Sequence, residues 1–108
     1  MESLTQLADL LKKQLGLTPY ESRAYVSLLA HGPMSPSEMA RKSDIPRPRA
    51  YDVLRSLMEK GLLTEQSGKP SVYAVVEPSQ GLKNLLANIE TETSRLLEDK
   101  RKVAQTLT

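Results

Sequence analysis

The chain has 108 residues, of which 39% are hydrophobic and 26% are charged, a composition typical of one small globular domain with one additional element. It contains no cysteine, which excludes disulfides, thiolate metal sites and cysteine nucleophiles. The net charge of +2 is too small to indicate a nucleic-acid partner by itself. No apolar run approaches the roughly 20 residues that a transmembrane helix needs, and residues 1–4 show no start of a signal peptide. We therefore expect a cytoplasmic protein without a membrane partner.

Three helices are predicted in the first part of the chain. Leucines recur with helical spacing over residues 4–15, which indicates an amphipathic helix. Thr18–Glu21 and Ser35–Glu38 each match a capping box, in which the hydroxyl and the carboxylate accept hydrogen bonds from each other's backbone N–H. In both, a proline occupies the first helical position, where no N–H is needed. These boxes predict helices over residues 19–30 and 36–43.

The next segments predict a helix-turn-helix followed by a β-hairpin. Residues 44–46 form a turn, and a longer helix is expected over residues 48–60, closed by Gly61. Two β-prone runs, 62–66 and 72–76, flank a polar loop at 67–71, which is typical of a hairpin with an exposed tip, or wing. Residues 1–77 are therefore predicted to form a winged helix-turn-helix domain that includes the helix 4–15.

Residues 78–108 are predicted to form one long helix with a coiled-coil seam. A 4-3 spacing continues along the whole segment, and its positions are apolar except for Thr93 and Lys100. A second copy of the chain is the simplest partner for this stripe, although the helix folding back on its own domain is the alternative. The expected fold class is mainly α with a small β-hairpin: a winged helix-turn-helix followed by a long C-terminal coiled-coil helix. The expected dimerisation residues are Leu82, Leu86, Ile89, Leu96, Val103 and Leu107.

The predicted helix 48–60 has one apolar side and one polar side. A helix of this kind can lie in the major groove of DNA with its first residues at the base edges, and arginine suits guanine or phosphate. Arg49 is therefore the leading DNA-contact candidate, followed by Arg47 and Arg55. The alternative is that these are solvated surface charges. The inward side holds Ala50, Val53, Leu54, Leu57 and Met58, and the polar side holds Arg49, Asp52, Ser56 and Glu59.

Other candidates for DNA contact have weaker support. Asp52 can accept from a cytosine amino group or orient a neighbouring arginine, and Ser56 lies on the same polar side. Tyr51 is expected at the edge of the apolar face, half-buried, with a hydroxyl that can reach a phosphate. Lys69 at the wing tip can reach the minor groove or a phosphate, or can simply keep the loop soluble. Ser35, which opens the helix 36–43, completes the candidate set.

No catalytic, cofactor or metal site is predicted. The single histidine, His31, falls at the end of the helix 19–30, where a cation is favourable against the helix dipole. The sequence shows no nucleophile with a base, no metal-ligand cluster and no phosphate-binding glycine loop. We therefore expect a protein that is not an enzyme and has no cofactor.

Three segments and the wing match a known family: LTPYESRAY (17–25), IPRPRAYDVLRSL (45–57), EKGL (59–62) and the wing residues Gly68, Lys69, Pro70 and Tyr73, followed by Pro78. They resemble the TrmB family of archaeal and bacterial transcription regulators. The resemblance implies a winged helix domain whose third helix contacts the operator, here through Arg47, Arg49 and Arg55. Larger members carry a C-terminal sugar-binding domain, which this chain does not show, so we expect a short form or a fragment.

These observations predict a homodimeric transcription regulator that binds double-stranded DNA. Helix 48–60 would enter the major groove, with the wing 67–71 near the backbone or minor groove. The alternative is a winged helix adaptor that binds an acidic protein in transcription or replication machinery. RNA binding is a weaker option, because no aromatic stacking platform is visible. Repression and activation both fit the sequence, and a small-molecule effector is not identified by it.

Overall fold

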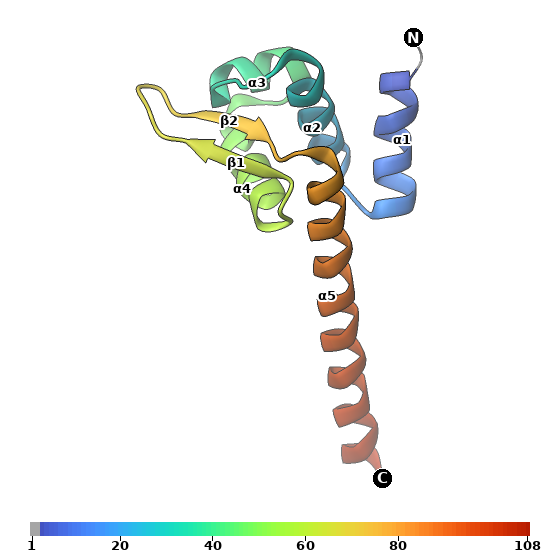
Figure 1. Ribbon diagram of the computed structural model, residues 1–108. Coiled ribbons are helices and arrows are strands. Elements are labelled where there is room, and N and C mark those ends of the chain that lie inside the picture. The colour runs from blue at the N-terminus through green and yellow to red at the C-terminus, as the bar shows by residue number, and fades with distance from the viewer. Residues whose placement is uncertain (1–2) are drawn as a thin grey trace.

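The computed structural model describes residues 3–108, so residues 1 and 2 of the expected domain 1–77 lie outside the described part of the chain. A helical body carries a hairpin on one side, and a long helix leaves the body at the other (Figure 1). The two strands pair antiparallel, with Leu63 opposite Val75 and Gln66 opposite Val72. In chain order the elements are α1 (Ser3–Leu15), α2 (Pro19–His31), α3 (Pro36–Ser43), the 3₁₀ helix η1 (Arg47–Arg49), α4 (Ala50–Glu59), β1 (Leu63–Gln66), β2 (Val72–Val75) and α5 (Pro78–Leu107).

Both expected capping boxes are formed. In α2 the Glu21 N–H donates to Thr18 Oγ1 (3.1 Å), and the Thr18 N–H donates to Glu21 Oε1 (2.9 Å). In α3 the corresponding N–H bonds join Ser35 and Glu38 in both directions, each at 3.3 Å. Since the first N–H groups of a helix have no partner within the helix, these bonds set where each helix begins.

The third helix of the helix-turn-helix differs from the prediction of one α-helix over residues 48–60. It begins as the 3₁₀ helix η1, becomes α-helical at Ala50, and ends at Glu59. Pro46 and Pro48 lack backbone N–H groups and constrain the residues before them, so the first turn tightens, and Arg49 N–H donates to the Pro46 carbonyl at 2.9 Å. Each strand is also one residue shorter than predicted.

The hydrophobic core joins α2, α3 and α4 and extends to the hairpin and to α5. The inward side of α4 is as predicted, since Ala50, Val53, Leu54 and Leu57 are buried and Met58 packs against them. The hairpin is tied to the helices through Met34, which exchanges two backbone hydrogen bonds with Tyr73 (3.1 and 2.8 Å). The largest fully buried apolar side chains are Leu28, Met39, Leu54, Leu57 and Leu85.

The first turns of α5 are docked on the domain, and the rest of the helix projects beyond it (Figure 1). Leu85 is buried and Ile89 packs partly against the core, whereas residues 90–108 are all exposed. Ile89, one of the expected dimerisation residues, therefore also contacts its own domain, and Leu85, absent from the predicted seam, anchors the helix there. The extents of 55 × 33 × 26 Å reflect this projecting helix. No helix within residues 3–108 is both long and apolar enough to cross a membrane.

Candidate nucleic-acid interface

The exposed surface of the helix-turn-helix is formed by η1 and the outer side of α4. Arg47 and Arg49 are both exposed at the start of this segment, as are Asp52 and Arg55 one to two turns later. Tyr51 is 61% exposed, so the expectation of a half-buried packing residue is wrong. Ala50 already fills the neighbouring position against the core, and the next residue along the helix turns outward to solvent. The ring of Tyr51 is therefore part of the exposed surface.

Asp52 and Arg55 form an ion pair on this surface. Arg55 Nη1 lies 3.0 Å from Asp52 Oδ1, one helical turn apart, and both side chains are largely exposed. Of the two roles that the sequence leaves open for Asp52, this geometry matches the orienting of a neighbouring arginine. An exposed pair of this kind contributes little to stability, about 0.3–0.5 kcal/mol.

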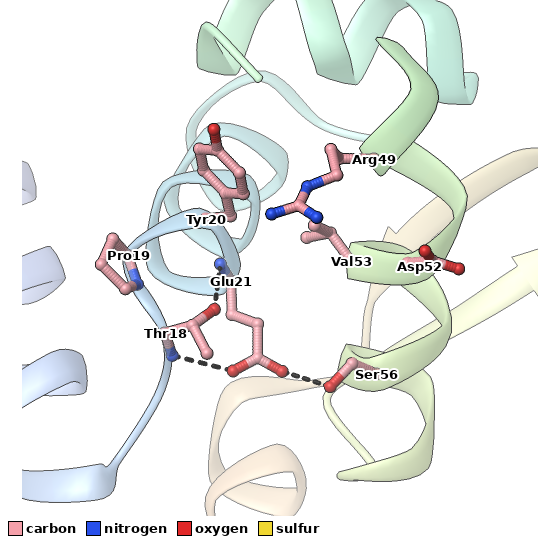
Figure 2. A pocket seen from close by; sticks show the side chains of 8 residues that line it. All are labelled: Thr18, Pro19, Tyr20, Glu21, Arg49, Asp52, Val53 and Ser56. Carbon is pink, nitrogen blue, oxygen red and sulfur yellow. Dashed lines mark hydrogen bonds between the residues drawn. The ribbon is translucent and has the colours of Figure 1, made fainter. Parts of the chain in front are cut away.

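Arg49 lies beside an aromatic ring that comes from another helix. Its guanidinium carbon is 5.8 Å from the centre of the Tyr20 ring, and the Arg23 guanidinium carbon is 5.0 Å from the same ring. Figure 2 shows Arg49 reaching from the start of the third helix toward Tyr20. Both distances are within the range of cation–π attraction. Two arginines from different helices are therefore grouped around one ring.

Arg49 and Tyr20 lie in a groove of about 550 Å³ between the start of α2 and the outer side of α4. Three predicted contact residues, Arg49, Asp52 and Ser56, are brought together along it. The groove also contains residues from α2 that were expected only to cap that helix (Figure 2). Its lining is Thr18, Pro19, Tyr20, Glu21, Arg49, Asp52, Val53 and Ser56.

Glu21 at the floor of this groove connects α2 to the last turns of α4. The residue is 2% exposed. Lys60 Nζ donates to both carboxylate oxygens of Glu21 (2.7 and 2.9 Å), and Ser56 Oγ donates to Oε2. Burial raises the pKa of Glu21, but hydrogen bonds from Lys60, Ser56 and the Thr18 N–H, with the Lys60 charge, outweigh it and hold the pKa below 4.5. Glu21 is thus a buried carboxylate held in its charged form.

The remaining predicted contacts lie in different places. Ser56 faces Glu21 and is half-buried, and Ser35 is buried with its hydroxyl hydrogen-bonded to Glu38 (3.2 Å), so both hydroxyls have partners inside the protein. Lys69 is exposed in the loop between β1 and β2, at the far end of the hairpin from α5. The predicted contact residues thus fall into three groups. The arginines, Tyr51 and Asp52 are exposed on the third helix, Lys69 is exposed in the wing, and the two serines are hydrogen-bonded inside the protein.

The base of the wing lies near the outer side of α4. Burial raises the pKa of Tyr73 on β2, and the charges of Glu65 and Tyr51 raise it further, whereas that of Arg55 lowers it. Tyr51 and Arg55 are four residues apart and so share one side of α4, and their charges act on Tyr73 of the hairpin. Arg49 and Ser56 lie on the side that faces α2. The exposed surface of α4 therefore has two flanks, one bordered by the wing and one by the groove.

Most of the predicted seam on α5 is exposed. The exposed fractions range from 44% for Leu86 to 82% for Leu107, and Ile89 is the member that packs against its own domain. Ion pairs along the helix, Arg95 with Glu92 and Asp99, lie on the projecting segment. Pairs at this spacing stabilise a helix that has little tertiary contact.

Sequence reasoning missed Tyr20, Arg23 and the second role of Glu21. Glu21 is recognisable as a capping residue, but nothing local indicates Ser56 and Lys60 as partners 35 and 39 positions away. Tyr20 lies directly after the proline of its capping box, a position that carries no signal for an arginine in another helix. Within residues 3–108 there is no group of histidine, cysteine or acidic side chains placed to hold a metal ion.

The family model described as "Sugar-specific transcriptional regulator TrmB" matches residues 11–79. TrmBL2 of Pyrococcus furiosus, named as an HTH-type transcriptional regulator, is 39% identical over 105 residues, which are 97% of this chain and 40% of the relative. TrmBL2 of Thermococcus kodakarensis, named as a DNA-binding HTH-type transcriptional repressor, is 38% identical over 102 residues, 94% of this chain and 39% of the relative. This chain therefore spans about 40% of the length of these curated relatives.

A solved structure of TrmBL2, described as an archaeal chromatin protein with a novel mode of DNA binding, is similar over 97% of this chain and 40% of that one. Its TM-score is 0.76 and its identity is 39%. The predicted winged helix-turn-helix with a two-stranded hairpin and a long C-terminal helix is confirmed. The matched residues 11–79 run from α1 to the start of α5 and include the whole helix-turn-helix and wing. The chain belongs to the TrmB family, a family of transcriptional regulators and not of enzymes.

Proposed function

We propose that this chain binds double-stranded DNA in a sequence-specific manner and regulates transcription as a homodimer. The observation that carries the proposal is the row of exposed arginines, Arg47, Arg49 and Arg55, on the outer side of a helix-turn-helix. Within residues 3–108, no acidic side chain lies within ion-pair distance of Arg47 or Arg49. Two positive charges at the start of a helix are thus available to bases or phosphates. A relative named as a DNA-binding repressor supports the same function.

The proposed docking places η1 and α4 in the major groove. Arg47 and Arg49 at the start of this segment reach base edges or phosphates first, and Arg55 and Tyr51 lie on the flank beside the wing. The loop 67–71 with Lys69 then lies near the backbone or minor groove. Because Ser35 and Ser56 have hydrogen-bond partners inside the protein, we expect them to position neighbouring elements more than to contact DNA directly.

The proposed dimer joins two copies of α5, with residues 1–77 as the DNA-binding domain and 78–108 as the dimerisation helix. Burying the exposed apolar residues of the seam is favourable, and the seam lies mostly beyond the reach of its own domain. A two-fold axis through such a pair presents two third helices to one face of DNA. Their target would be an inverted repeat with half-sites about 34 Å apart.

Selection from fragmented genomic DNA tests the function. The purified protein is incubated with fragments of genomic DNA from the source organism at about 150 mM salt, and retained fragments are sequenced. Enrichment of a few inverted-repeat sites is the expected result, and a steep loss of affinity with added salt should accompany it, since each phosphate contact releases counterions.

Two other outcomes would change the proposal. Uniform retention of all fragments would indicate an architectural binder, the class to which the TrmBL2 structure's description as a chromatin protein points. No retention, with the dimer intact, would contradict DNA binding and favour a winged helix adaptor for an acidic protein. In that case affinity for the partner should depend weakly on salt if the interface is mostly apolar.

A further inference from the structure

The environment of Arg49 differs from that of Arg55, the arginine of α4 that forms an ion pair. Arg55 donates to a carboxylate, Asp52, which uses part of its donor set and offsets its charge. Arg49 instead lies over the ring of Tyr20, with 5.8 Å between the guanidinium carbon and the ring centre. Within residues 3–108, neither Arg49 nor Arg23 has an acidic side chain within ion-pair distance.

An aromatic ring orients a guanidinium without neutralising it. The attraction comes from the ring quadrupole and leaves all five N–H donors free at the edge of the guanidinium plane. A carboxylate partner would hold the same side chain but occupy donors that a base or phosphate needs. Tyr20 therefore favours orientations in which Arg49 lies beside the ring and keeps its charge and its donors.

The ring itself is held in place relative to α4. Tyr20 is half-buried in the first turn of α2, directly before Glu21, which the capping box and the bonds to Ser56 and Lys60 connect to the end of α4. Figure 2 shows the Tyr20 ring on α2 and the Arg49 side chain on the third helix approaching each other across the groove, with the Glu21 bonds below them. A ring fixed in this way lowers the rotamer freedom that Arg49 would lose on binding.

We propose that Tyr20 is a positioning residue for Arg49 in DNA recognition. The proposal rests on the proposed function, because Tyr20 acts only through the DNA contact of Arg49 and makes no contact with DNA of its own. It predicts that the effect of the ring on affinity depends on the presence of Arg49, and that the hydroxyl group of Tyr20 is dispensable.

A double-mutant cycle tests this. The probes are a duplex of about 30 base pairs recovered from the genomic selection and a scrambled duplex of equal composition. The variants are Tyr20→Phe, Tyr20→Leu, Arg49→Ala and Tyr20→Leu with Arg49→Ala, with thermal unfolding measured for each. We expect Tyr20→Phe to bind like the wild type and Tyr20→Leu to raise Kd about 2- to 10-fold on the selected duplex. In the Arg49→Ala background, Tyr20→Leu should change Kd by less than about 2-fold.

A matched control uses Arg23, which lies on the same ring at 5.0 Å. In an Arg23→Gln background, Tyr20→Leu should still weaken binding, because the coupling is specific to Arg49. Tyr20→Met is a second ring-free variant if Tyr20→Leu does not fold.

The outcomes separate the two proposals. If the wild type binds neither probe, or if Arg49→Ala leaves Kd unchanged, DNA recognition by Arg49 is wrong. If Arg49→Ala weakens binding but removal of the Tyr20 ring does not, the positioning role is wrong and DNA recognition stands. If Tyr20→Leu weakens DNA binding equally with and without Arg49, the ring has a general structural effect and the positioning role is wrong. If Tyr20→Phe weakens binding, the hydroxyl group makes a contact of its own, and the positioning role is again wrong.

Discussion

Glu21 performs two tasks at once, one local and one tertiary. It closes the capping box of α2 with Thr18 and also accepts hydrogen bonds from Ser56 and Lys60 in the last turns of the third helix. A buried carboxylate without partners would be strongly unfavourable, whereas one with several donors is stable in its charged form. The groove beside Arg49 therefore depends on a charge held inside the protein.

Glu21→Gln should lower the free energy of unfolding by about 1–3 kcal/mol at neutral pH, because charge-assisted bonds are lost and Lys60 keeps a charge that is 25% exposed. Since the pKa of Glu21 is lowered in the folded state, its contribution is present above about pH 4.5 and is lost as the pH falls through the lower folded value. Denaturant unfolding at several pH values should show that the free energy of unfolding falls less on acidification in the variant than in the wild type. Glu38→Gln is the matched control, since Glu38 caps α3 but is exposed.

Asp52 provides a second prediction for a single residue. It is exposed on the side of α4 proposed to face DNA and pairs with Arg55. Asp52→Asn should lower Kd for selected and scrambled duplexes alike, about 2- to 5-fold, because it removes a negative charge near phosphates and releases Arg55. Fluorescence anisotropy on both duplexes measures this. A loss of affinity that is confined to the selected duplex would instead show that Asp52 contacts a base, as in the cytosine contact that the sequence allows.

The turn that follows α4 lies so close to α5 that it has no room for a side chain at Gly61. Gly61 has a positive φ of 78°, and a Cβ there would lie 2.4 Å from the Asn84 Cβ. Asn84 Nδ2 donates to the Gly61 carbonyl at 2.7 Å, and Gln80 donates in turn to Asn84 Oδ1 at 2.8 Å. The close approach of a backbone turn to α5 sets the direction in which the long helix leaves the domain.

Gly61→Ala should therefore destabilise the domain by at least about 2 kcal/mol, from the left-handed φ and from displacement of α5. Gly16→Ala is the matched control, because Gly16 has a similar φ of 74° but a Cβ there would have no neighbouring atom within 4 Å. We expect Gly16→Ala to cost about 1 kcal/mol in a chemical denaturation experiment. Equal losses in the two variants would show that contact with Asn84 contributes nothing.

The projecting half of α5 dominates the overall shape of the protein. A 30-residue helix is about 45 Å long, and only its first turns are covered by the domain. The exposed apolar stripe on the remainder is the feature that the proposed dimer explains. A charged residue introduced on the stripe should therefore disrupt the proposed dimer, whereas one introduced at the adjacent position should not.

Leu96→Glu should convert the proposed dimer to a monomer, whereas Leu97→Glu should leave that dimer intact. The two leucines are equally exposed (45% and 47%), but only Leu96 follows the 4-3 spacing of the seam. Leu97 takes a flanking position, where glutamate is common in coiled coils. Sedimentation or light scattering at several concentrations measures the mass. Dissociation by Leu97→Glu alone would place the interface on a different face of α5, and no effect of either would contradict the coiled-coil dimer.

The starts of α2 and α3 and the inward side of α4 were predictable from the amino-acid sequence. Capping boxes at Thr18 and Ser35, the proline that follows each, and Gly61 all act on neighbours within one turn, so their effect is visible in a short window. The amphipathic pattern of α4 is equally local, since residues three and four apart share a face. The winged helix fold and the candidate arginines follow from these local rules.

Contacts between side chains of different elements became visible only in the folded protein. The Tyr20 ring and Arg49, and Glu21 with Ser56 and Lys60, come from helices whose relative position depends on the packing of the whole core. Leu85 and the seam leucines are equally apolar in sequence, and only docking on the domain separates an anchor from an exposed stripe. The pattern of a helix predicts its faces, but the neighbour of each face is set by the packing of all the elements together.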